Sequence, residues 1–145
     1  MRKEIVIDLK AIKNENDMVY RFYKAMDCFY SLSENEWVER IERNEQRISW
    51  DAFSDDLSGI GASTGRPDDL VFILTHVLEL RKTLGEKVYL HLLDVLAGLT
   101  PPAQRIDGVN FYFQIRDGEY EPEKEALHIR LHRGLSGGKD MNNAY

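Results

Sequence analysis

The sequence predicts an α/β fold, in which a small, mostly parallel sheet of three strands is flanked by helices. Short runs of β-branched and aromatic residues alternate with longer segments whose apolar residues recur every three or four positions. Helices between consecutive strands provide the crossovers that parallel strands require. The length of 145 residues suits one domain. We expect that domain in residues 1–135, followed by a disordered tail with little to bury in residues 136–145.

The first strand is predicted at residues 4–9, where EIVIDL is rich in β-branched residues. The KNEN that follows supplies turn and helix-capping residues. A helix is then predicted from Asp17 to about Phe29, because its apolar side chains recur with helical spacing and share one face. These side chains are Val19, Phe22, Tyr23 and Met26.

The sequence SENE predicts the start of a second helix, at residues 34–45. It forms a capping box, in which the side chains of Ser33 and Glu36 each bind the other residue's backbone amide. Trp37 and Ile41 lie one turn apart in this helix. Since most of its other residues are charged, we expect a solvated surface helix held to the protein by Trp37.

The second half of the chain continues the pattern of strands and helices. Residues 70–77, LVFILTHV, predict a buried central strand. Thr83 and Glu86 form a second capping box, which predicts a helix from there until Gly98 and the TPP that follows it.

Residues 110–116 alternate apolar and polar side chains and predict the third strand. Asp117 and Gly118 then give a turn signal. Residues 126–134, ALHIRLHRG, alternate again and allow an extra strand, paired as a hairpin. Its apolar face would carry Leu127, Ile129 and Leu131.

Composition excludes several classes of function. The formal net charge of −6 argues against general binding of nucleic acid and favours a basic partner. No segment approaches the roughly 20 apolar residues of a membrane span. The amino-terminal segment does not read as a secretory signal, and Cys28 is the single cysteine, so we expect a cytoplasmic protein without a disulfide.

Residues 48–61, ISWDAFSDDLSGIG, predict a helix with three aspartates, although aspartate is a poor helix former. The side chains of Trp50, Phe53, Leu57 and Ile60 anchor it to the core. Asp51 and Asp55 share another face with Ser54 and Ser58, whereas Asp56 points away from both groups. Like charges four residues apart cost about 0.2–0.5 kcal/mol, and Ser49 as the N-cap would help Asp51 more than Asp55. Folding does not explain this cost, so the paired carboxylates predict a surface that binds a cationic partner.

The segment SWDAFSDDLSG resembles the second-helix motif of the barstar family of intracellular ribonuclease inhibitors, whose usual form is close to N-L-D-A-L-W-D-C-L-T-G. The identical positions are Asp51, Ala52, Asp55, Leu57 and Gly59. The order of elements agrees with that family from about residue 4 to residue 116. The resemblance implies a three-stranded parallel sheet flanked by helices. It also implies that Asp51 and Asp55 enter a ribonuclease active site where substrate phosphates would lie, and a loose alignment adds Asp94 of a later helix.

The sequence departs from the family in four places. The tyrosine-glycine pair ahead of the helix is replaced by residues 46–48, and the tryptophan between the two aspartates is Ser54. Residues 30–47 form an insertion with its own helix, and residues 117–145 extend beyond the usual end. We therefore expect a target other than the usual ribonuclease, such as a toxin domain from a competing bacterium that this immunity protein would neutralise.

Two other classes of function stay open from the sequence. The aspartates could be the solvated face of a small structural or regulatory domain. An enzyme would have to use those carboxylates or the histidines of HIRLH, His128 and His132, which lie about 13 Å apart in an extended strand. Because that distance is too long for one metal and no phosphate-binding glycine loop is present, we predict no catalytic residue, metal or cofactor.

Overall fold

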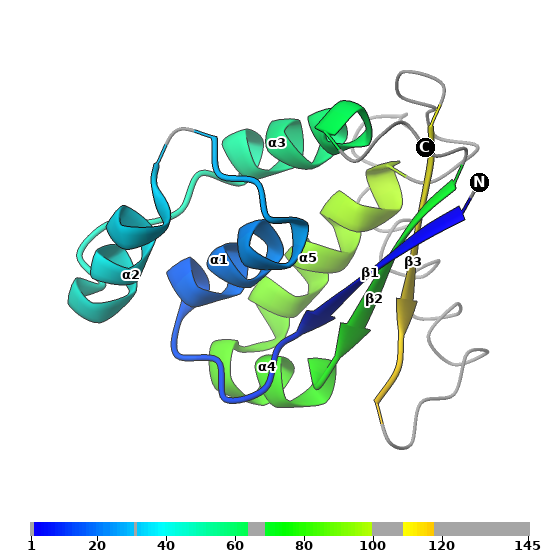
Figure 1. Ribbon diagram of the computed structural model, residues 1–145. Helices are drawn as coiled ribbons and strands as arrows, with labels where there is room; N and C mark the ends of the chain where they lie inside the picture. The colour runs from blue at the N-terminus through cyan, green and yellow to red at the C-terminus, as the bar shows by residue number, and fades with distance from the viewer. Residues whose placement is uncertain (1, 31, 64–68, 100–108, 118–145) are drawn as a thin grey trace, which may run out of the picture.

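The computed structural model describes residues 2–30, 32–63, 69–99 and 109–117, except for the side chains of residues 60–63. Within these ranges the chain forms three strands and five helices (Figure 1). They follow one another as β1 (Arg2–Asp8), α1 (Glu15–Met26), α2 (Glu34–Arg43), α3 (Trp50–Ser63), β2 (Asp69–Thr75), α4 (Val77–Leu84), α5 (Glu86–Leu99) and β3 (Asn110–Ile115). The extra strand and the tail predicted after residue 117 lie outside the described residues.

The three strands form a parallel sheet in the order β1-β2-β3. Ile7 of β1 lies opposite Leu74 of β2, which in turn lies opposite Ile115 of β3. This arrangement confirms the predicted α/β fold with a three-stranded parallel sheet. It also places the helices on one side of the sheet, because both crossovers run in the same direction and parallel crossovers are right-handed (Figure 1).

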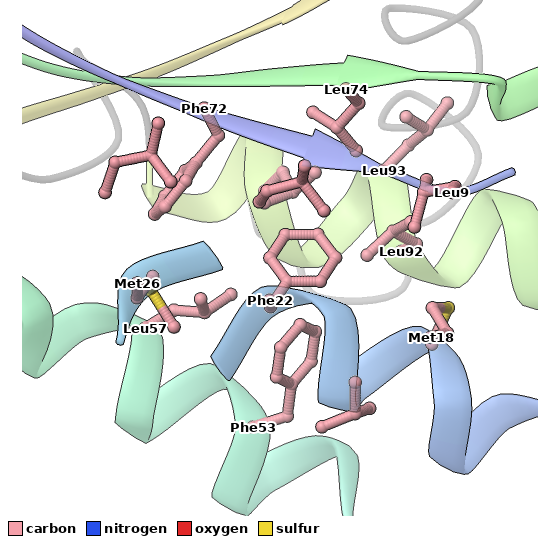
Figure 2. Packing of buried hydrophobic residues seen from close by; sticks show 14 of the residues in the cluster. Leu9, Met18, Phe22, Met26, Phe53, Leu57, Phe72, Leu74, Leu92 and Leu93 are labelled. Atoms are coloured by element: carbon pink, nitrogen blue, oxygen red, sulfur yellow. The ribbon is translucent and has the colours of Figure 1, made fainter. Parts of the chain in front are cut away.

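The main core lies between the sheet and the helices. Its centre is Phe22 of α1, whose ring lies 5.1 Å from that of Phe53 in α3 and 6.2 Å from that of Phe72 in β2, both edge-on (Figure 2). All three side chains are almost completely buried. Edge-to-face aromatic contacts add about 0.5–1.5 kcal/mol each to the free energy of burial. Phe22 therefore joins α3 to the sheet through α1.

Helix α1 begins and ends earlier than the sequence predicts. Asn14 is its N-cap and accepts a hydrogen bond from the Asp17 amide over 2.9 Å. The helix ends at Met26, because Asp27 adopts a left-handed conformation with φ of 51°. The prediction that it continues to Phe29 is wrong, although Phe29 still packs against the core.

Helix α2 confirms the predicted capping box. The Ser33 hydroxyl accepts from the Glu36 amide over 3.2 Å, and the Glu36 carboxylate accepts from the Ser33 amide over 2.9 Å. Trp37 and Ile41 are its buried residues, both 8% exposed. The helix packs against α1 and lies far from the sheet (Figure 1).

Helix α4 is not predicted from the sequence. The predicted strand over 70–77 ends at Thr75, and His76, with φ of 60°, turns the chain directly into this helix. His76 provides no side-chain cap. Instead the Asp117 carboxylate accepts from the Val77 and Leu78 amides, each over 2.9 Å. The cap comes from a residue 40 positions along the chain, so no local pattern could reveal it.

The predicted capping box of Thr83 and Glu86 is also wrong. Thr83 belongs to the end of α4, and Gly85, with φ of 96°, separates this helix from α5. Glu86 is the first residue of α5, and its carboxylate accepts from the Arg81 guanidinium. The α4–α5 junction therefore depends on a glycine turn and an ion pair in place of a serine or threonine cap.

Candidate partner-binding site

Helix α3 carries the predicted site and is anchored to the core by its buried side chains. The Ser49 hydroxyl accepts from the Ala52 amide over 3.2 Å, and the Ser49 carbonyl accepts from the Phe53 amide over 3.0 Å. Ser49 is thus the predicted N-cap. Phe53 is 1% exposed and Leu57 is fully buried, so the opposite side of the helix must face solvent.

Asp51 and Asp55 lie on that solvent-facing side and are both exposed. They stand one turn apart, a rise of about 6 Å along the helix axis. Within the part of the chain that the structure describes, neither carboxylate has a hydrogen bond or an ion pair. Their charges are therefore available to an external cation.

Asp56 has a different environment. Its carboxylate accepts a hydrogen bond from the Tyr23 hydroxyl of α1 over 2.5 Å. Burial, and then this hydrogen bond to a carboxylate, raise the pKa of Tyr23 above its ordinary value. Asp56 consequently joins α3 to α1, a role that the sequence analysis missed. The signal was available, since a tyrosine in a buried stripe needs a partner for its hydroxyl.

The two predicted serines differ in their hydrogen bonding. The Ser58 hydroxyl donates to the Asp55 carbonyl of its own helix over 2.8 Å. The hydroxyl proton is thus already donated within the helix, so Ser58 can offer a partner protein only a hydrogen-bond acceptor. Ser54 is half-buried, on the side of α3 that carries Trp50 one turn earlier.

Helix α5 meets the beginning of α3 through an aromatic stack. The Trp50 and His91 rings lie 3.9 Å apart and 17° from parallel. His91 is exposed, whereas Trp50 is partly buried against the core. Asp94 lies almost one turn beyond His91 and is half-buried. The stack therefore brings the helix that carries Asp94 next to the start of α3.

Tyr30 lies on the other flank of α3. Its side chain is 42% exposed, and its ring lies 6.3 Å from that of Tyr23. Its hydroxyl lies 3.9 Å from the place that a Cβ would take at Gly59. In the sequence, Tyr30 is the first residue of the predicted insertion, and no role is predicted for it. The structure places an exposed aromatic side chain beside the carboxyl-terminal half of the acidic helix.

The described residues contain no group of three or more histidine, cysteine, aspartate or glutamate side chains that could hold a metal ion. His128 and His132 lie outside them. The helices within these residues are also too short or too polar to span a membrane.

Comparison of the chain with protein-family models, with curated proteins and with solved structures finds no match.

Proposed function

We propose that this protein is a cytoplasmic inhibitor that blocks the basic active site of a ribonuclease or ribonuclease-type toxin. The observation that carries the proposal is the pair Asp51 and Asp55, exposed and without partners in the described structure, on a helix anchored by buried residues. An active site that cleaves RNA has to be electropositive, because it holds phosphate and stabilises the negative charge of the transition state. Two carboxylates fixed one helical turn apart can occupy such a site in place of phosphates.

The strongest contacts would join Asp51 or Asp55 to arginines of the target, because bidentate arginine–carboxylate pairs are both strong and geometrically specific. The chain's net charge of −6 would also speed the encounter with a basic target. The resemblance of residues 49–59 to the barstar motif and the three-stranded parallel sheet agree with this function. The proposed surface also includes Ser54 and Ser58 of α3, and Asp94 of α5, the helix that meets the start of α3 at the Trp50–His91 stack.

The test is an RNA-cleavage assay with the candidate toxin domain encoded beside this gene, supplemented by a panel of small basic ribonucleases. Wild-type protein is titrated in parallel with the double variant Asp51→Ala, Asp55→Ala. We expect near one-to-one inhibition by wild type. The double variant should inhibit at least 10²-fold more weakly, because truncating one partner of a buried interfacial charge pair costs roughly 2–5 kcal/mol.

Glu42→Ala, Glu45→Ala is the matched control. Both glutamates are exposed, and removing them changes the net charge by the same amount as the test variant does. If this control loses inhibition as strongly as the test variant does, inhibition depends on the net charge of the protein, and the proposal that α3 is the binding site is wrong. If wild type inhibits and both double variants do too, another surface binds the target. If wild type inhibits none of the enzymes, the proposed function is wrong, and the acidic helix is a solvated surface.

A further inference from the structure

The side of the sheet that faces away from the helices carries its own apolar patch. Successive strand residues point to opposite faces. The inward set joins one core cluster with the apolar residues of the helices and includes Ile7, Leu74 and Ile115. The alternate residues Val6, Val71, Ile73 and Tyr112 point the other way, and we call them the outer face. The register places Val6 beside Ile73 and Val71 beside Tyr112, so this patch is continuous across all three strands.

The centre of the outer face is buried, although its margins are not. Val71 is 1% exposed and Ile73 is 2% exposed, whereas Val6 is 58% exposed and Tyr112 is 40% exposed. Neither Val71 nor Ile73 belongs to the core cluster beneath the helices. The described helices therefore do not supply this burial, and a further part of the protein must cover the centre of the outer face.

Polar pairs mark the end of this apolar patch at the carboxyl ends of the strands. Thr75 donates to the Asp8 carboxylate over 3.1 Å, and Arg116 donates to the Gln114 side chain over 2.9 Å. Whatever covers Val71 and Ile73 must therefore be apolar over a short length only. A segment with a few alternating apolar residues fits this requirement better than a long apolar helix does.

Residues 126–132 have that pattern, and the chain can bring them to the outer face. Asp117 is fixed by its hydrogen bonds to the amino end of α4, so the following residues start at the carboxyl end of β3. Residues 118–125 could span roughly 25 Å when extended, which exceeds the approximate 20 Å length of a six-residue strand. The segment after them can therefore return over the sheet.

We propose that residues 126–132 lie across the outer face, with Leu127, Ile129 and Leu131 covering Val71 and Ile73. An extended segment in this position leaves His128, Arg130 and His132 on its solvent side, because side chains alternate along it. The C-terminal segment then forms a second layer of the domain, on the side opposite to α3. This inference does not depend on the proposed function.

Thiol accessibility in the full chain tests the proposal. The single native cysteine is removed by Cys28→Ser, and Ile73→Cys places one thiol in the outer face. This thiol should react slowly with a thiol reagent. Adding Ile129→Asp should speed the reaction at least about tenfold, because the rate follows the fraction of molecules in which the face is open. His128→Asp is the matched control, since it alters the adjacent residue and adds the same charge, and it should leave the rate unchanged.

Leu74→Cys, on the inward side of the same strand, separates local uncovering from global unfolding. Its thiol should stay protected when Ile129→Asp is added. Equal effects of Ile129→Asp and His128→Asp at position 73, or no effect of either, would overturn the proposal. Protection at position 73 that disappears on dilution would also overturn it, and would identify a second copy of the chain as the cover.

A cross-linking measurement does not require a destabilising change. In the Cys28→Ser background, Ile73→Cys with Ile129→Cys should form an intramolecular disulfide on mild oxidation. Ile73→Cys with His128→Cys should form much less, because its second thiol would point to solvent. Equal yields from the two pairs would contradict the proposed alternation.

Discussion

Asp55 and Asp56 are neighbours in the sequence but have opposite environments. Consecutive helix residues are about 100° apart around the axis, so one carboxylate points to solvent while the next reaches α1. The Tyr23 hydroxyl donates to Asp56 from a residue that is 3% exposed. A hydrogen bond to a charged group contributes about 1.5–3 kcal/mol. Asp56 therefore offsets part of the cost of three aspartates in one helix.

Tyr23→Phe should lower the free energy of unfolding by about 1–3 kcal/mol at pH 7, because it removes this hydrogen bond and leaves the Asp56 carboxylate without its donor. Urea unfolding measures the change. Tyr112→Phe, at an exposed position, should change it little. A loss of less than about 0.5 kcal/mol in Tyr23→Phe would show that the hydrogen bond adds nothing beyond an ordinary surface contact.

The same residue predicts how stability depends on alkaline pH. Burial and the hydrogen bond to Asp56 raise the pKa of Tyr23 in the folded protein above its ordinary value of 10.0. Above pH 10 the unfolded chain therefore loses this proton while the folded chain keeps it. Stability from Tyr23 is fully present below pH 10 and declines as the pH rises further. Unfolding measured between pH 9 and about 11 should show a smaller decline in Tyr23→Phe than in wild type.

At the scale of elements, α3 contains a glycine that its conformation does not require. Among the described residues, a Cβ at Gly59 would meet the Tyr30 hydroxyl alone, at an ordinary contact distance of 3.9 Å. Glycine in a helix interior costs about 0.5–1 kcal/mol relative to alanine, so Gly59→Ala should raise the free energy of unfolding by about that amount. Gly85→Ala should lower it, because Gly85 has φ of 96°. Urea unfolding of the two variants should show changes in the free energy of unfolding that have opposite signs. Changes of the same sign would contradict the different conformational roles given to the two glycines.

Elements whose signals are local could be predicted from the sequence, and those with distant partners could not. Ser33 and Glu36 cap α2 within four residues, and the SENE pattern identifies this helix. Asp117 caps α4 from the far end of β3, so the helix looked like a continuation of the central strand. The candidate site likewise has features with local sequence signals and features that depend on distant residues. Helical spacing places Asp51 and Asp55 on one face, whereas the Trp50–His91 stack depends on how α5 packs against α3.

At the scale of the whole molecule, α2 is attached to the domain through α1 and not through the sheet. It packs against α1 through Trp37 and Ile41 and lies far from the sheet (Figure 1). Asn14 also donates to the Ile41 carbonyl over 2.9 Å. Elements with few buried contacts open at a lower free energy than the global unfolding reaction. We therefore expect α2 to open while α1 and the sheet remain folded.

Native-state hydrogen exchange should show α2 amides exchanging at a lower opening free energy than those of β2. Trp37→Ala should speed α2 exchange more than β2 exchange, because the lost contacts attach α2 to α1. The comparison variant is Phe72→Ala in the central strand, which should lower protection in both elements together. Equal opening free energies for α2 and β2 in wild type would show that the two unfold as one cooperative unit.

The strand order allows the sheet to form from its amino-terminal strand onward while the chain is synthesised. Because neighbouring strands follow one another along the chain, β2 can pair with β1 before β3 has left the ribosome. The Phe22, Phe53 and Phe72 rings that join α1, α3 and β2 all belong to this first portion. Domains begin to form from the amino terminus during synthesis. Helix α3 would then pack against Phe22 early in translation. Strand β3 would complete the sheet later, by pairing with the edge of β2.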